Sequence, residues 1–257
     1  MSFDVNNSKS VLYIKKFFSS KIIKLSNTQY YNEGNPLLTD HQYDLLIDKL
    51  KKLDPKNKLL SQIGTKVHSK NKVKLPYHMG GMDKFYNQNE INKWLKREVQ
   101  GNEKFVISDK LDGNSGILVK NGNNLKLYSR GNGTTGRDIS HLIPFIGVPD
   151  LSGVTEVAVR GELIVSRNDY TKYSSKYKNP RNFANSMCVA KQHPQLNLLN
   201  FVAFDLVKPR MKTLDGFKML EKIGFKVPQL NYVSKKFINC ETLKSLLEKR
   251  RESSDYE

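Results

Sequence analysis

The sequence of 257 residues has little of several features that define protein classes. Its two cysteines, Cys188 and Cys240, are far apart and form no Cys-x-x-Cys pair, which excludes a disulfide framework and a cysteine zinc site. No apolar run approaches the ~18 residues of a membrane span, and the first residues lack the basic-then-apolar pattern of a signal peptide. We therefore expect a soluble, intracellular protein that lies in a reducing compartment and binds no membrane.

Histidines are few, and basic residues outnumber acidic ones. The five histidines are scattered without metal-ligand spacing, which disfavours a transition-metal site. Lys and Arg total 43 against 25 Asp and Glu, so the net charge is +18. A field this positive attracts polyanions and indicates a nucleic-acid partner, although lysines that only solvate the surface would give the same composition.

The first part of the chain has the pattern of a small helical module. Residues 8–33 contain neither proline nor glycine and repeat apolar side chains at helical spacing, which predicts a long helix. Thr39 predicts the cap of a second helix that ends before Pro55. The polar stretch 65–74 is interpreted as a linker.

Strands dominate after this stretch, with a hairpin turn predicted at Asn121-Gly122. The predicted strands are residues 104–108, 116–120, 125–129, 156–160, 162–165 and 200–207. Helices are predicted over residues 89–99, 213–223 and 242–251. Strands without regular βαβ alternation indicate an α+β fold built on antiparallel sheet. We therefore expect a helical domain over 1–70 and an antiparallel-sheet domain over 71–257.

Residues 105–114 join an apolar strand to a lysine, an aspartate two positions later and a glycine. This order predicts that the amine of Lys110 lies at the end of a buried strand, at the mouth of a pocket. An unprotonated lysine amine is a nucleophile that can form a covalent intermediate. Lys-x-Asp-Gly alone also describes a β-turn formed by Asp112 and Gly113, so both interpretations are open at this point.

A glycine-rich loop follows Arg130. Residues 131–136 match the Gly-x-Gly-x-x-Gly pattern of dinucleotide-binding proteins. That site requires a helix directly after the loop, whereas hairpin strands are predicted around this one, which disfavours it. A loop of small residues after a cation can still offer main-chain donors to a phosphate or a ribose.

Four segments, in this order and spacing, resemble the adenylation domain of NAD-dependent DNA ligases: Lys110-Leu111-Asp112-Gly113, Arg130 to Ile139, Val159-Arg160-Gly161-Glu162-Leu163 and Asn179-Pro180-Arg181-Asn182. With Tyr30-Tyr31 followed by Asp40, Tyr43 and Asp44, the helical module resembles the nicotinamide mononucleotide (NMN) module that separates these ligases from ATP-dependent ones. Alone, its tyrosines would indicate ordinary helix packing. The resemblance implies a small helical module followed by an ATP-grasp-like nucleotidyltransferase domain.

The resemblance also implies roles for the nucleotide site. Lys110 would attack the α-phosphorus of NAD, release NMN and hold AMP. Asp112 would orient the lysine and the ribose side of the pocket. Arg130 and Glu162 would contact the ribose, and Glu162 would also place Mg²⁺ through water. Arg181 would face a phosphate or the DNA end.

The leaving NMN half would bind the helical module, where carboxylates suit a cationic nicotinamide and tyrosines suit stacking. The residues implied by the resemblance are Tyr30, Tyr31, Asp40, Tyr43 and Asp44. Gly81 and Met82 fall where the family has a loop at the pocket edge. Ser108 stands where the family usually has a glutamate that reads adenine, so we expect adenine recognition to rest on the main chain.

The implied activity is the sealing of nicked double-stranded DNA in replication and repair, with NAD as AMP donor and Mg²⁺ as cofactor. The family continues into further DNA-binding domains, so we expect the nucleotidyltransferase domain to be incomplete at its C-terminal side and to seal nicks poorly alone. We also expect a monomer. Two alternatives are open: a covalent nucleotidyltransferase that uses ATP or GTP, and a non-catalytic, nucleic-acid-binding remnant of a ligase.

Overall fold

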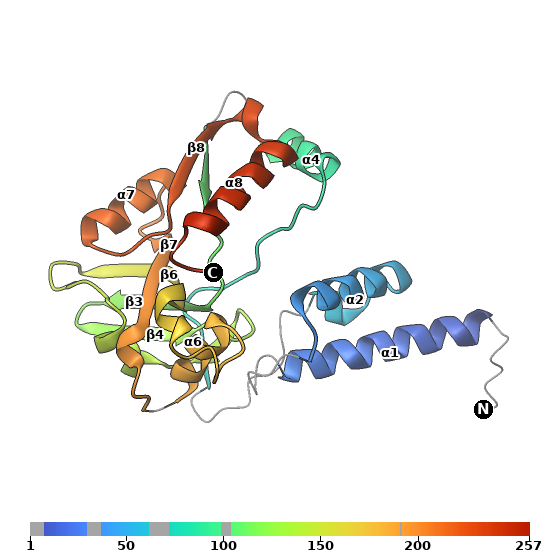
Figure 1. The fold of residues 1–257 in the computed structure, drawn as a ribbon, viewed down its shortest axis with the longest axis horizontal. Helices are drawn as coiled ribbons and strands as arrows, with labels where there is room; N and C mark the ends of the chain where they lie inside the picture. Colours follow the sequence, from blue (N-terminus) through green and yellow to red (C-terminus); the bar gives the residue numbers. More distant parts are fainter. Residues whose placement is uncertain (1–7, 30–36, 62–71, 99–103, 191) are drawn as a thin grey trace. The chain divides into compact units, whose positions relative to one another are not determined.

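The structure is a computed structural model, which describes residues 8–29, 37–61, 72–98, 104–190 and 192–257. The chain forms two compact units (Figure 1). One comprises Met1–Gly81 with Arg130–Arg137, and the other comprises Met82–Ser129 with Asp138–Glu257. The domain boundary expected near residue 70 stays a prediction.

The described part of the first unit contains the helices α1 (Ser8–Thr28), α2 (Asp40–Leu53) and α3 (Lys58–Ser61). α2 begins with the predicted cap: the Thr39 hydroxyl accepts a hydrogen bond from the Gln42 main chain, and the Gln42 side chain accepts one from the Thr39 N–H. The helices share a small core formed by Ile23, Leu50 and Leu59. Both predicted helices are confirmed, although residues 30–33 of the first lie outside the described residues.

A short antiparallel ribbon also belongs to the first unit. In it, β1 (Lys72–Lys74) pairs with β5 (Thr135–Arg137). Assigning residues 72–74 to a linker was wrong, because their main-chain groups pair with a strand that is distant in sequence. Polar composition alone does not reveal such a partner.

The second unit is built on a four-stranded antiparallel sheet with the order β4-β3-β6-β7. Its strands are β3 (Asn114–Asn121), β4 (Asn124–Ser129), β6 (Glu156–Val165) and β7 (Leu199–Lys208). The predicted hairpin forms, but its turn is Gly122-Asn123, because Gly122 adopts the left-handed φ of 56° that glycine tolerates. The two predicted strand pieces around Gly161 form one continuous strand, β6.

Helices cover this sheet and complete the main core. α6 (Pro180–Val189) contacts β3 and β6, and α7 (Thr213–Ile223) contacts β7 (Figure 1). α7 ends at Gly224 in a left-handed conformation, as predicted. The core includes side chains from both the sheet and these helices, among them Leu118, Val159, Leu163, Phe183, Phe201 and Leu220.

A second, smaller core lies beside a two-stranded ribbon of the same unit. β2 (Lys104–Ser108) pairs with β8 (Leu230–Ser234). α4 (Gln88–Glu98) and α8 (Cys240–Ser253) contribute side chains to this core, and α8 runs beside the ribbon in Figure 1. A short helix, α5 (Arg167–Thr171), follows β6. β2 leads directly to the predicted nucleophile, Lys110.

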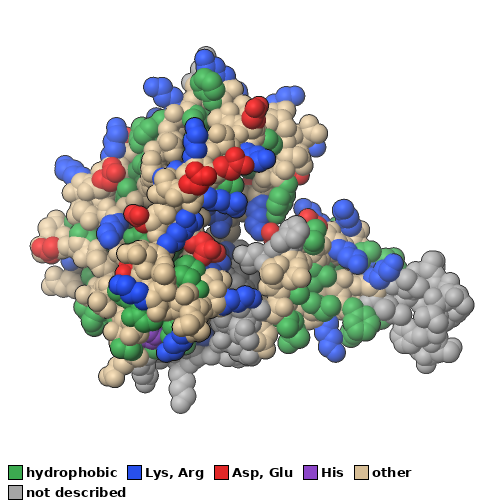
Figure 2. All heavy atoms as spheres, in the orientation of Figure 1, with side chains coloured by type: hydrophobic (Ala, Val, Ile, Leu, Met, Phe, Trp, Pro, Cys, Tyr) green, Lys and Arg blue, Asp and Glu red, His purple; other side chains and the backbone are tan. Residues whose placement is uncertain are grey.

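The observed sheets and helices confirm the predicted α+β class. Lys and Arg side chains are spread over the face drawn in Figure 2, in keeping with the net charge of +18. Among the described residues, none of the helices is both long enough and apolar enough to cross a membrane.

Candidate nucleotidyl-transfer site

Lys110 lies where the sequence predicted it, just after a strand. β2 ends at Ser108, which pairs with Leu230 at the end of the ribbon, and β3 of the four-stranded sheet begins at Asn114. Lys110 therefore occupies the junction between the ribbon and the sheet. Its side chain is exposed, so the amine is accessible to a substrate.

Glu162 is a buried carboxylate beside this junction. It faces Ser115 across the β3–β6 pairing, and only 7% of its surface is exposed. Oε1 accepts a hydrogen bond from the Gly113 N–H at 3.2 Å, and Oε2 accepts one from the Ser115 hydroxyl at 2.9 Å. Burial raises the pKa of Glu162 to about 7, although both hydrogen bonds and the charge of Lys110 oppose this rise. The carboxyl therefore changes its protonation state near neutral pH.

Gly113 allows the junction to approach β6 closely. A Cβ atom at this position would lie 2.4 Å from the main-chain oxygen of Leu163 and 3.1 Å from the Glu162 side chain. No side chain fits at that distance from a main-chain atom. The glycine of the Lys-x-Asp-Gly segment is thus required by packing, whatever the role of the lysine.

Asp112 forms an ion pair with Arg181. Arg181 Nη1 donates to Asp112 Oδ1 at 2.6 Å. Arg181 lies in the first turn of α6, which starts with an Asn179 cap and with Pro180 in its first turn. The helix start therefore places a cation beside residues 109–113, called the Lys110 segment below.

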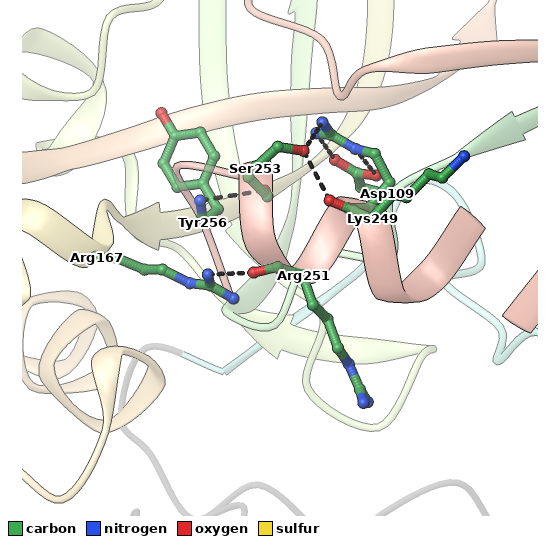
Figure 3. Close-up of polar contacts among 8 residues, drawn as sticks. Asp109, Arg167, Lys249, Arg251, Ser253 and Tyr256 are labelled. Atoms are coloured by element: carbon green, nitrogen blue, oxygen red, sulfur yellow. Dashed lines mark hydrogen bonds and ion pairs between the residues drawn. The ribbon is translucent and has the colours of Figure 1, made fainter. Parts of the chain in front are cut away.

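A second ion pair, which sequence reasoning missed, flanks Lys110 on the other side. Arg250 of α8 donates from Nε to Asp109 Oδ1 at 2.9 Å and from Nη2 to Asp109 Oδ2 at 2.6 Å (Figure 3). The main-chain N–H of Asp112 donates to the Glu257 oxygen at 2.8 Å. No local pattern indicates these contacts, because their partners are more than a hundred residues apart in the sequence.

Arg130 begins the glycine loop, which belongs to the first unit. Its Nε donates to the main-chain oxygen of Met79 at 3.3 Å. The Asn132 side chain accepts hydrogen bonds from the main-chain N–H groups of Thr134 and Thr135. A Cβ atom on Gly131 would lie 2.0 Å from the Thr135 oxygen. The loop leads into strand β5 and not into a helix, which confirms that it is not a dinucleotide fingerprint.

The predicted NMN residues are described only in part. Tyr30 and Tyr31 lie outside the described residues. Asp40 is the first residue of α2, and its side chain is also outside the described part.

The remaining predicted residues of this group lie in separate segments. Tyr43 and Asp44 are half-buried on α2, and the Tyr43 hydroxyl donates to Asn27 Oδ1 of α1 at 2.8 Å. The Tyr43 ring also packs against the small helical core. Gly81 and Met82 are exposed. Tyr43 therefore has a structural role, and its role in binding stays a prediction.

The predicted Mg²⁺ contact at Glu162 fits best through water. The described residues contain no group of three or more His, Cys, Asp and Glu side chains that could hold a metal. Both Glu162 oxygens already accept hydrogen bonds, so direct coordination would have to displace one. Mg²⁺ commonly keeps several waters and takes further ligands from substrate phosphates.

Comparisons with known proteins identify the family of the chain. The family model described as "NAD-dependent DNA ligase adenylation domain" matches residues 68–257, more than half of the chain. The DNA ligase of Acanthamoeba polyphaga mimivirus is 37% identical over 246 residues, which cover 91% of this chain and 37% of that protein. Putative DNA ligase 205R of Invertebrate iridescent virus 6 is 31% identical over 241 residues, which cover 89% of this chain and 37% of that protein.

More distant similarity is also found. The DNA ligase of Mesomycoplasma hyopneumoniae (strain 7448) is 26% identical over 293 residues, which cover 92% of this chain and 41% of that protein. The chain thus spans about two fifths of the length of these curated relatives. With the family match over residues 68–257, the chain belongs to the family of NAD-dependent DNA ligase adenylation domains.

Proposed function

We propose that this chain is the adenylation portion of an NAD-dependent DNA ligase, in which Lys110 accepts AMP from NAD. The observation that best supports the proposal is an exposed lysine amine whose neighbours on both sides are fixed. Asp109 pairs with Arg250, Asp112 pairs with Arg181, and the Gly113 N–H bonds to a buried carboxylate. A nucleophile that is accessible, and whose main chain is fixed by these contacts, is suited to in-line attack.

In the proposed reaction the Lys110 nitrogen attacks the α-phosphorus of NAD. A nitrogen–phosphorus bond forms while the bond from that phosphorus to the NMN oxygen breaks. The amine gives up a proton, NMN leaves and AMP stays on the lysine as a phosphoramidate. Transfer of a phosphoryl group depends chiefly on positioning and on stabilisation of charge.

The residues around Lys110 suit these two requirements. Arg181 brings a cation to the segment, where it would face a phosphate once its pairing with Asp112 is shared with the substrate. Glu162 would contact the ribose and, through water, Mg²⁺, which would neutralise charge on the transferred phosphate. The roles of the remaining residues stay predictions: Tyr30, Tyr31, Asp40, Tyr43, Asp44, Gly81, Met82 and Arg130.

The later steps of the proposed function involve DNA. AMP would pass from Lys110 to the 5′-phosphate of a nick, and the 3′-hydroxyl would then displace AMP to join the strands. The net charge of +18 favours binding to the phosphate backbone. The same charge favours the second candidate, a chain that binds nicked duplex without reacting with NAD.

The proposal is tested by incubating the chain with Mg²⁺ and NAD, ATP or GTP and measuring its intact mass. We expect an increase of one AMP and release of NMN with NAD alone. Lys110→Arg keeps the positive charge but removes the nucleophile, so it should give no adduct.

The other outcomes are equally distinct. Modification by ATP or GTP but not by NAD would contradict the donor. Salt-sensitive binding to nicked duplex without any adduct would instead support the non-catalytic candidate.

A further inference from the structure

We infer that the ion pair between Asp109 and Arg250 positions Lys110 for attack, which makes both of them positioning residues for the transfer. This inference rests on the proposed function. It goes beyond that function because neither Asp109 nor Arg250 belongs to the four segments that carry the family resemblance, and neither was given a role in the nucleotide site. Asp109 directly precedes the nucleophile, and Arg250 reaches it from α8.

The geometry of the pair is that of a structural clamp. Two guanidinium nitrogens of Arg250 contact the two oxygens of Asp109, at 2.9 Å and 2.6 Å. Only 19% of the Arg250 side chain and 14% of the Asp109 side chain are exposed. A two-point contact fixes orientation as well as distance, and shielding from water strengthens it compared with a surface pair.

Arg250 is itself held in place by its surroundings. Its Nη1 donates to the Ser253 hydroxyl at 2.9 Å. Arg167, just after β6, donates from Nη1 to the Arg251 oxygen at 2.6 Å (Figure 3). Its main-chain N–H donates to the Asp255 oxygen at 2.8 Å. The end of α8 is therefore tied to the end of β6, the strand that carries Glu162. Through the clamp, the position of Lys110 is therefore fixed relative to β6, the strand that carries Glu162.

Lys110 depends on this clamp because its own side chain is exposed. Asp109 is held by Arg250, and Asp112 by Arg181 and the Glu257 oxygen. The free amine therefore projects from a short segment fixed at both ends. A shift of about 1 Å in a reacting group can cost on the order of a hundredfold in rate, so loosening one end should slow the transfer.

A positioning role can be separated from an effect of charge. Asp109→Asn leaves an unpaired cation near Lys110, which favours the neutral amine. Arg250→Gln leaves an unpaired anion, which favours the charged amine. Through charge alone, the two variants would shift the pH profile of adenylation in opposite directions. Through positioning, both would slow the reaction in the same direction, and the double variant would be no slower than either single one.

The experiment measures the single-turnover rate of AMP transfer from NAD to the chain at saturating NAD, across pH. NAD affinity and thermal unfolding are measured in parallel. Asp109→Asn and Arg250→Gln should each lower the rate by roughly 10- to 100-fold with little change in NAD affinity. Arg250→Lys should restore part of the rate.

A matched control is Asp205→Asn, which breaks another ion pair in the same unit. Arg160 Nη1 contacts Asp205 Oδ2 at 2.7 Å between β6 and β7. The control should leave the rate unchanged, even where it lowers the melting temperature as much as Asp109→Asn does.

Each further outcome decides a different point. If the unchanged chain reacts and Asp109→Asn reacts equally fast, this inference alone is overturned. Opposite shifts of the two pH profiles, or an equal loss of rate in Asp205→Asn, would also overturn it. If the unchanged chain forms no adduct with NAD, the proposed function fails and the role of the pair in transfer fails with it.

Discussion

Two loops of this chain look alike in sequence and are held in different ways. Residues 109–113 and residues 130–134 each follow a strand and each combine a cation with glycine. Remote side chains fix the first: Arg181, Arg250 and Glu162 all bind it. The second is held by its own atoms and by the main chain of Leu75 and Met79, whose N–H groups donate to the Thr134 and Gly133 oxygens at 2.9 Å and 2.8 Å.

The glycine loop also has hydrogen bonds within itself. The Gly133 N–H donates to the Arg130 oxygen at 2.9 Å, and the Asn132 N–H donates to the Thr135 oxygen at 3.1 Å. The comparison teaches that main-chain hydrogen bonds and its own side chains hold the glycine loop, whereas charged side chains from elsewhere in the fold hold the loop that carries Lys110. The first loop should therefore be sensitive to distant substitutions, and the second to its own.

The largest expected effect comes from Gly113→Ala. The new Cβ atom would meet the Leu163 oxygen at 2.4 Å, so strand β6 or the Lys110 segment has to move. We expect a loss of about 4 kcal/mol in the free energy of unfolding and no detectable adenylation. Urea unfolding and intact mass measure the two effects. Gly153→Ala, where no atom lies within 4 Å, is the control, and equal stability of the two variants would contradict the packing argument.

Glu162→Gln should change how stability depends on pH. Burial raises the pKa of Glu162 from 4.5 to about 7, so between these values the folded chain binds more protons than the unfolded chain. Its contribution to stability is therefore full below pH 4.5 and is lost as pH rises to about 7, by roughly 3 kcal/mol at most.

Because glutamine does not titrate, Glu162→Gln should remove this loss. Thermal unfolding at several pH values measures it. A variant whose stability falls between pH 4.5 and 7 as steeply as that of the unchanged chain would show that the carboxyl is ionised throughout.

Arg181→Gln should affect activity more than stability. The Arg181 and Asp112 side chains are 28% and 40% exposed, so loss of their ion pair should cost about 1 kcal/mol or less. We expect adenylation to slow about 10-fold, because a cation that faces phosphate is lost. Arg97→Gln, which breaks an exposed pair with Glu98, should leave the rate unchanged. Equal rates for these two variants would remove Arg181 from the site.

The smallest effect is expected in the second loop. Asn132→Ala removes the acceptor for the N–H groups of Thr134 and Thr135, which should cost about 1 kcal/mol. Hydrogen exchange of these two amides should speed up, while the amides of Asp112 and Gly113 stay protected. Faster exchange in both loops would contradict the view that the two loops are held independently of each other.

The parts of the fold that local signals determine were predictable. The Thr39 cap of α2, the Gly224 end of α7 and the β3–β4 hairpin all follow from residues within a few positions. α6 was overlooked, although Asn179 and Pro180 form a recognisable helix start. Strands β1 and β8 could not be found in this way, because their partners lie far away in the sequence.

The candidate site, like the fold, was predictable only in the parts that local sequence signals mark. Lys110, Asp112, Glu162 and Arg181 were selected by the order of the segments they occupy, and the structure brings Asp112 to Arg181. Arg250 was not selected, because the sequence predicts only a basic helix over residues 242–251 and gives no local sign of the contact with Asp109. Sequence therefore indicated the proposed nucleophile better than the groups that hold its segment.

The most direct test of the central claim is to locate AMP on the chain after reaction with NAD and Mg²⁺. Peptide mass spectrometry of the reacted chain assigns the modified side chain. The account predicts AMP on Lys110 and on no other lysine, with less of it in Asp109→Asn than in Asp205→Asn. AMP on another lysine, or none on a folded chain that binds NAD, would contradict it.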